Sequence, residues 1–188
     1  MVLIFLRMFI LLALFFIVLT WFTISSYRTF FYNTTQNELF ERASMCSERF
    51  TQLLLNEQPE TAPFMEEVTQ LAKKGNIRIT LILPEGSVIA DSHENPRNME
   101  NHISRPEIKT ALKNGSGHNV RFSDTLDRRM MYSALKLTHD GTLVGFLRMA
   151  VSTEALSSEL VDLISKIILG GLVIVIGSAL SAWWISRR

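Results

Sequence analysis

One stretch decides the fold of this 188-residue chain: Arg129-Met-Met-Tyr-Ser-Ala-Leu-Lys-Leu137, then His139-Asp140-Gly141, then Leu143-Val-Gly-Phe-Leu-Arg-Met-Ala-Val151. In the first segment two sets of side chains alternate, as the two faces of a β-strand require. One of these sets is Met131, Ser133, Leu135 and Leu137. The Asp-Gly pair between the segments favours a tight turn. The stretch therefore predicts two antiparallel strands joined as a hairpin.

Three segments further upstream predict the rest of a sheet. Ile77–Leu83 and Val88–Ala90 form a second hairpin pattern, and His118–Ser123 is the remaining strand. Before that strand, the S-x-x-E spacing of Ser104–Glu107 is a capping-box pattern, and the helix it opens ends at Asn114-Gly115. Five antiparallel strands with a helix inserted after the second predict an α+β domain.

A long helix precedes the sheet, because no glycine or proline occurs between Arg28 and Asn56. Apolar residues spaced 4, 3, 4 and 3 apart form a seam on it: Leu39, Ala43, Cys46, Phe50 and Leu53. The seam either packs on the helix's own domain or meets its twin in a homodimer. Candidates for such a dimer or transmission surface are Leu39, Cys46, Phe50 and Leu53.

Two other local features concern this helical region. A break at Gln58–Thr61 separates the long helix from a short amphipathic one that is expected to end at Gly75. Cys46 is the single cysteine, which excludes an internal disulfide framework. Its place on the seam favours a small buried apolar group over a redox sensor.

Two apolar spans bracket the polar region. Met8–Ile24 is uncharged, and Ile167–Ile185 runs for 19 residues without a charge. A helix needs about 20 apolar residues to cross the hydrocarbon core of a bilayer. Arg7 precedes the first span and Arg187 follows the second, and basic residues near span ends favour the cytoplasmic side. We expect a two-pass protein in contact with membrane lipid, with both termini in the cytoplasm and the central domain outside.

The second span also carries small residues. Gly170, Gly177 and Ser181 would let a neighbouring helix approach closely. They are candidates for a packed helix interface in the membrane, and the alternative is ordinary lipid-facing composition.

The region between the spans is nearly neutral. Tyr27–Ser165 holds 18 acidic and 15 basic residues, a net charge of −3, since Arg7, Lys166, Arg187 and Arg188 lie outside it. This balance gives no electrostatic reason to expect nucleic acid as a partner.

Several short motifs succeed one another in a recognisable order. They are Arg78-Ile-Thr-Leu-Ile82, Glu85-Gly86, Ala90-Asp91-Ser92, Met99-Glu100-Asn101-His102, Arg105-Pro106-Glu107, Met131-Tyr132, Gly145-Phe146-Leu147-Arg148, Ala150-Val151 and Ile185-Ser186-Arg187-Arg188. Together they resemble the extracytoplasmic PAS-like (PDC, or single Cache) sensor domain of bacterial sensor histidine kinases of the PhoR type. The last motif resembles the start of a HAMP linker.

The resemblance implies a homodimeric receptor of the bacterial inner membrane. Its signal would be a small molecule or an envelope protein, and a cognate response regulator would be reached only through a kinase part. This chain holds no H-box, since His93-Glu94 departs from the pattern at Asn95-Pro96, and no glycine-rich ATP loop. The chain by itself is therefore not an enzyme. It would be either the sensory part of a longer kinase or a natural short protein.

The expected organisation combines the spans with the resemblance. It comprises a cytoplasmic N-terminus 1–7, a transmembrane helix 8–27, outer helices 28–75, the PAS-like sheet domain 76–152, an exit helix 153–166, a transmembrane helix 167–185 and the start of HAMP at 186–188.

The candidate sites fall in the long connection and on the sheet. In the resemblance, Asp91, Asn101, Arg105 and Glu107 tie the connection to the sheet by hydrogen bonds. A ligand pocket between the two would be lined by His102, Arg121, Arg129 and Tyr132, where arginine suits a carboxylate or phosphate. The alternative is that both arginines face solvent. We predict no catalytic residue, no cofactor and no metal site, because the histidines and carboxylates near Asp91 match no established ligand spacing.

Two other functions are compatible with the sequence. Similar outer domains and HAMP linkers occur in chemotaxis transducers and cyclic-dinucleotide enzymes. A membrane-anchored interaction protein that does not signal is the remaining alternative.

Overall fold

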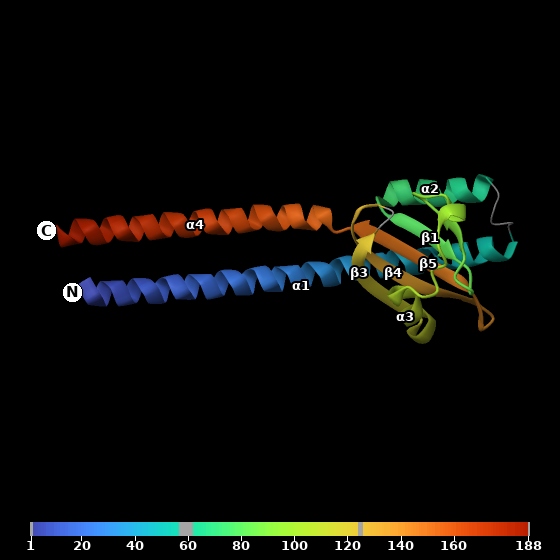
Figure 1. The fold of residues 1–188 in the computed structure, drawn as a ribbon, viewed down its shortest axis with the longest axis horizontal. Coiled ribbons are helices and arrows are strands. Elements are labelled where there is room, and N and C mark those ends of the chain that lie inside the picture. Colours follow the sequence, from blue (N-terminus) through green and yellow to red (C-terminus); the bar gives the residue numbers. More distant parts are fainter. Residues whose placement is uncertain (1, 57–61, 124–125, 188) are drawn as a thin grey trace. The chain divides into compact units, whose positions relative to one another are not determined.

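The computed structural model describes residues 2–56, 62–123 and 126–187. They belong to two units: a sheet unit, Asn33–Glu154, and a helical unit that combines Met1–Tyr32 with Ala155–Arg188. Figure 1 traces the chain through both. The predicted helix break at Gln58–Thr61 lies at positions outside the described residues.

Two long helices carry the apolar spans. Helix α1 (Val2–Asn56) is continuous, as the absence of glycine and proline predicts, and α4 (Glu154–Ser186) carries the exit helix directly into the second span. Both are long and apolar enough to cross a membrane, within Phe9–Leu55 and Val161–Ser181. Their large apolar side chains are mostly exposed within the protein, as contact with lipid would require. These helices indicate a membrane protein.

Inside the helical unit, α1 and α4 approach each other at Gly171. A Cβ atom at this position would fall on the ring of Phe16, whereas Gly170 and Gly177 face open space. Ser181 is exposed and donates its hydroxyl to the carbonyl of Gly177. The contact between α1 and α4 within this chain therefore does not use Gly170, Gly177 or Ser181, and the interface predicted at these residues stays a prediction. The close approach uses a different face of α4.

The sheet unit contains a five-stranded antiparallel sheet of order β2-β1-β5-β4-β3. Its strands are β1 (Arg78–Ile82), β2 (Val88–Asp91), β3 (Ser116–Ser123), β4 (Arg128–His139) and β5 (Thr142–Ser152). The hairpin predicted around Asp140-Gly141 is β4–β5, and it lies within the body of the sheet. The predicted α+β class with five antiparallel strands is confirmed.

The β4–β5 turn shows why Asp140-Gly141 was a strong signal. His139 pairs with Thr142, so only two residues form the loop. Both have positive φ, +50° for Asp140 and +78° for Gly141. Such a turn matches the twist of the flanking strands and suits Asp-Gly.

Buried apolar residues of α1 and α2 (Ala62–Gly75) cover one face of the sheet. On α1, Leu39, Phe50 and Leu53 are all at most 2% exposed within one chain. Side chains buried this way cannot also form a seam between two copies, so their assignment to a dimer interface is wrong. They pack on their own domain instead. Cys46 is half-buried beside them, and burial raises the pKa of its thiol.

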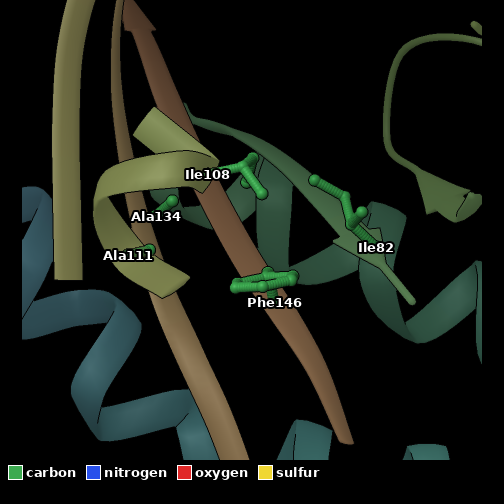
Figure 2. Packing of buried hydrophobic residues seen from close by; sticks show 5 residues of the cluster. All are labelled: Ile82, Ile108, Ala111, Ala134 and Phe146. Carbon is green, nitrogen blue, oxygen red and sulfur yellow. The ribbon is translucent and has the colours of Figure 1, made fainter. Parts of the chain in front are cut away.

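Helix α3 (Pro106–Asn114) lies on the opposite face of the sheet. Figure 2 shows Ile108 and Ala111 of α3 packed against Ile82, Ala134 and Phe146 from three strands. The helix sits close because β3 has glycine beneath it: a Cβ at Gly117 would fall on the backbone of Glu107 and Ala111.

The start of α3 differs from the predicted capping box. Arg105, not Ser104, occupies the N-cap position and makes no side-chain cap, and Pro106 begins the helix. Glu107 does not reach back to the cap, because it is wholly buried and faces arginines of the sheet. The polar connection before α3 includes a short 3-10 turn, η1 (Pro96–Asn98).

Candidate functional site, a charge cluster beneath helix α3

Charged side chains gather on the face of the sheet that α3 covers. We call this set the charge cluster: Arg78 on β1, Asp91 on β2, Glu107 on α3, Arg121 on β3 and Arg148 on β5, with Thr80, Tyr132 and His102 beside them. The antiparallel register aligns Thr80 with both Asp91 and Arg148, which places these groups on one face.

Asp91 anchors one end of the cluster. Nε of Arg78 lies 3.0 Å from both oxygens of Asp91, and the Thr80 hydroxyl donates to Oδ2 at 2.7 Å. The backbone amides of His93 and Glu94 donate to Oδ1 at 2.9 and 3.0 Å. These contacts fix the end of β2 and the start of the connection, as the resemblance implied for Asp91.

Arg148 occupies the centre and is 2% exposed. Its Nη2 donates to Thr80 Oγ1 at 3.1 Å, and its Nη1 lies 3.4 Å from Glu107 Oε1. Its guanidinium also lies over the ring of Tyr132, 4.9 Å from the centroid. Burial lowers the pKa of Arg148 to about 10, so it remains charged at neutral pH.

Arg121 completes the cluster from β3. Its guanidinium lies 4.4 Å from the centroid of Tyr132, and its Nη2 lies 3.5 Å from Glu107 Oε1. The ring of Tyr132 thus contacts two cations, an arrangement that the negative face of an aromatic ring favours. The Arg121 side chain is 21% exposed, so the cluster reaches solvent near β3.

His102 is buried in the connection, and its imidazole is neutral. Burial is the main cause that lowers the pKa of His102 to about 4, followed by the positive charges of Arg148 and Arg105. The part of this shift that the two arginines cause indicates a positive potential around His102.

The cluster contains more positive than negative charge. Three guanidinium groups, Arg78, Arg121 and Arg148, face the two carboxylates of Asp91 and Glu107. Several buried polar atoms in the described part of the chain have no hydrogen-bond partner: Arg78 Nη2, Arg148 Nε, Arg121 Nε, Arg105 Nε, His102 Nδ1 and Glu107 Oε2. Unused donors and excess positive charge together suit an anion with oxygen acceptors.

Three of the four predicted ligand-lining residues lie in or beside this cluster. They are His102, Arg121 and Tyr132. Arg129 does not join them, because it is exposed at the start of β4 and pairs in register with Phe122 on the other face.

The other connection residues lie at separate places. Asn101 binds the β1–β2 turn, donating from Nδ2 to the carbonyl of Glu85 at 2.8 Å. Arg105 pairs at 3.6 Å with Glu100 of the same connection, so it does not tie the connection to the sheet as predicted.

Sequence reasoning missed the two central arginines, Arg78 and Arg148, and the hydroxyl of Thr80 that joins them to Asp91. The signal was present: each arginine is the single charged residue of a mostly apolar strand, Arg78-Ile-Thr-Leu-Ile82 and Gly145–Val151. A charged residue in such a strand must find a partner when both faces of the sheet are covered.

A hollow of about 310 Å³ lies elsewhere in the sheet unit. Thr35, Glu38, Leu39 and Arg42 of α1 line it together with Gly75, Asn76 and Val151. None of the predicted ligand residues contributes to its wall.

The chain that follows β5 bonds back to β4 within the sheet unit. Thr153, the residue before α4, donates from its amide and its hydroxyl to the carbonyl of Arg129, at 3.0 and 3.1 Å. Arg129 directly precedes Met130, which packs with Tyr132 and Ala150. The residue that precedes α4 is therefore bonded to the strand that carries Tyr132.

Comparisons with known proteins bear on the fold. No protein-family model and no curated protein matches the sequence. Among solved structures, the sensor domain of the Vibrio cholerae histidine kinase DctB aligns with a TM-score of 0.57 at 15% identity, over 72% of this chain and 54% of that one. The Escherichia coli DcuS sensor domain aligns with a TM-score of 0.53 at 8% identity, over 73% of this chain and 96% of that one.

A chemoreceptor domain is similar to about the same degree. The ligand-binding domain of Pseudomonas fluorescens CtaA, in complex with L-serine, aligns with a TM-score of 0.51 at 18% identity, over 66% of this chain and 56% of that one. The sheet unit has the PDC/Cache sensor-domain fold. This chain spans about half the length of the DctB domain. At such identities the likeness establishes the fold, and the PDC/Cache fold on its own carries no particular ligand.

Proposed function

We propose that this chain is the sensing and transmembrane-signalling part of a two-component sensor histidine kinase of the PhoR type, and that its outer domain responds to a small anion. The observation that carries the proposal is a PDC/Cache sheet domain inserted between two helices of membrane length. The charge cluster supports an anionic signal, because its donors and positive charge exceed what Asp91 and Glu107 satisfy.

The topology in this proposal is two-pass, with the sheet unit outside the cytoplasmic membrane and both termini inside. The basic flanks Arg7 and Arg187 support it. In a Cys46→Ser background, Lys113→Cys is expected to react with a membrane-impermeant maleimide in cells with a permeabilised outer membrane. Val2→Cys, which keeps Arg7, should react at least tenfold less until the cells are lysed. Equal labelling of both positions before lysis would contradict this topology.

The mechanism we propose is a population shift between two packings of the membrane helices in a homodimer. Signal binding would alter the sheet, and Thr153 links β4 to the start of α4. The phosphorylating histidine, and through it the response regulator, would belong to a kinase part beyond this chain.

Gly171→Leu tests the mechanism with Gly170→Leu as its matched control. Both variants add the same side chain, but only the first falls on the ring of Phe16, since Gly170 faces open space. With the whole chain fused through its C-terminus to the HAMP and kinase parts of a two-component kinase, Gly171→Leu is expected to change kinase output at least fivefold. Gly170→Leu should change it less than twofold. Unchanged output in both variants would contradict a role for this helix contact in signalling.

A chemotaxis transducer is the second candidate, favoured by the similarity to the CtaA domain. The gene sequence downstream of the second membrane helix distinguishes the two candidates. An H-box and an ATP-binding domain after a HAMP linker would support the kinase, and a long heptad helix without an H-box would support the transducer.

A further inference from the structure

Glu107 is the carboxylate that lies next to both Arg148 and Arg121 in the charge cluster. The residue is fully buried, and its Oε1 lies 3.4 Å from Arg148 Nη1 and 3.5 Å from Arg121 Nη2. Both distances exceed the roughly 2.7–2.9 Å usual between a charged donor and a carboxylate. Glu107 Oε2 and the Nε atoms of both arginines have no hydrogen-bond partner among the described residues. The Glu107 carboxylate therefore balances the charge of the two arginines, but it makes only long hydrogen bonds to them and leaves some of their N–H donors without an acceptor.

No other carboxylate of the cluster can serve Arg148 and Arg121. Asp91 is already bonded to Arg78, Thr80 and two backbone amides. If Glu107 left, the two guanidinium groups that contact the ring of Tyr132 would have no balancing charge. Such a site would bind an external carboxylate or leave two cations uncompensated, one of them buried.

We propose that Glu107 is an internal ligand: its carboxylate occupies the place of a signal carboxylate between Arg148 and Arg121, and an external carboxylate binds only when Glu107 leaves. This inference rests on the proposed anion-sensing function and adds the regulation of that site. Because Glu107 belongs to the first turn of α3, its displacement moves the start of this helix. That turn touches β3, where Gly117 lies against the backbone of Glu107.

Chemical rescue tests the proposal in the full chain, in detergent micelles at pH 7. Glu107→Ala removes the carboxylate together with the methylene that carries it, leaving space for acetate. We expect calorimetry to show a lower Tm for Glu107→Ala than for the parent protein. Sodium acetate at 100 mM should raise the variant's Tm by about 5 °C relative to sodium chloride, as ligand binding to a folded protein does.

The controls separate a carboxylate site from a general salt effect. The parent protein and Glu85→Ala, which removes an exposed glutamate, should shift by less than 1 °C with acetate. Acetamide, the neutral counterpart of acetate, should not rescue Glu107→Ala. Equal acetate shifts in the variant and the parent protein, or no shift in the variant, would overturn the proposal.

A second variant covers the case in which Glu107→Ala does not fold. Glu107→Gln keeps the shape of the side chain and removes its charge, so acetate displaces it more easily than it displaces glutamate. An acetate shift in Glu107→Gln that exceeds the parent's supports the proposal, and an equal shift overturns it. If acetate does not rescue the Glu107 variants, the internal-ligand proposal fails, but the kinase-output assay with Gly171→Leu still tests the proposed signalling function. The two proposals can therefore fail independently.

Discussion

Asp91→Ala is expected to lower the free energy of unfolding of the sheet unit by about 3–5 kcal/mol. The substitution leaves Arg78 charged and buried, with its side chain only 2% exposed and its main acceptor gone. It also removes the acceptor for Thr80 and for the backbone amides of His93 and Glu94. An uncompensated buried charge costs far more than a surface pair, so this is the largest single-residue effect that we expect.

Native-state hydrogen exchange of the amides in β4 and β5 measures this loss, because the central strands exchange only when the unit opens globally. Glu100→Ala is the control: that carboxylate is 88% exposed in its pair with Arg105, and its loss should cost about 0.5 kcal/mol or less. Asp91→Asn should give an intermediate loss, since the amide keeps the shape and some acceptors. A loss below about 1 kcal/mol for Asp91→Ala would show that Arg78 finds another partner.

Acidification from pH 7 to pH 4 is expected to destabilise the sheet unit, with His102 as a main contributor. In the unfolded chain His102 takes up a proton near pH 6.5, but in the folded protein its pKa is about 4. Between these values the unfolded state binds more protons, so stability is present above pH 6.5 and is lost as the pH falls. After a reduction for screening by solvent near the site, this difference in pKa corresponds to a loss of about 2 kcal/mol in the free energy of unfolding.

His102→Gln should remove this part of the pH dependence. Calorimetric Tm values at pH 7, 6, 5 and 4.5 are expected to fall less steeply in the variant than in the parent protein, by a total of roughly 8 °C. Burial and Arg78 also lower the pKa of His93, which acts in the same direction, so His93→Gln is measured in parallel. Parallel slopes for His102→Gln and the parent protein would refute the assignment to His102.

The strands were predictable because each carries its own local signal. Alternation identified β4, and Asp140-Gly141 identified the turn that joins it to β5 and sets their register. The prediction of a capping box at Ser104 was wrong because Glu107, which would close the box, makes a tertiary contact with arginines of the sheet instead. Glu107 gains more from the buried Arg148 and the partly exposed Arg121 than from the cap, and no local spacing contains that information.

The candidate site was only partly predictable for a related reason. Arg121 and Tyr132 could be proposed from the order of the strands, but Arg148 and Thr80 required the pairing of β1 with β5. The contact between α1 and α4 within the chain could not be predicted from the sequence. Small residues occur on several faces of α4, and only the position of Phe16 selects Gly171 over Gly170.

The charge cluster also has a consequence for how the chain folds. A slip of one residue between neighbouring strands turns every side chain to the opposite face of the sheet. Here such a slip would drive Arg78 or Arg148 into the apolar layer against α1 and α2, where the described residues offer no carboxylate at a buried position. The same arginines that make the site therefore penalise mispaired sheets and help to select a single register during folding.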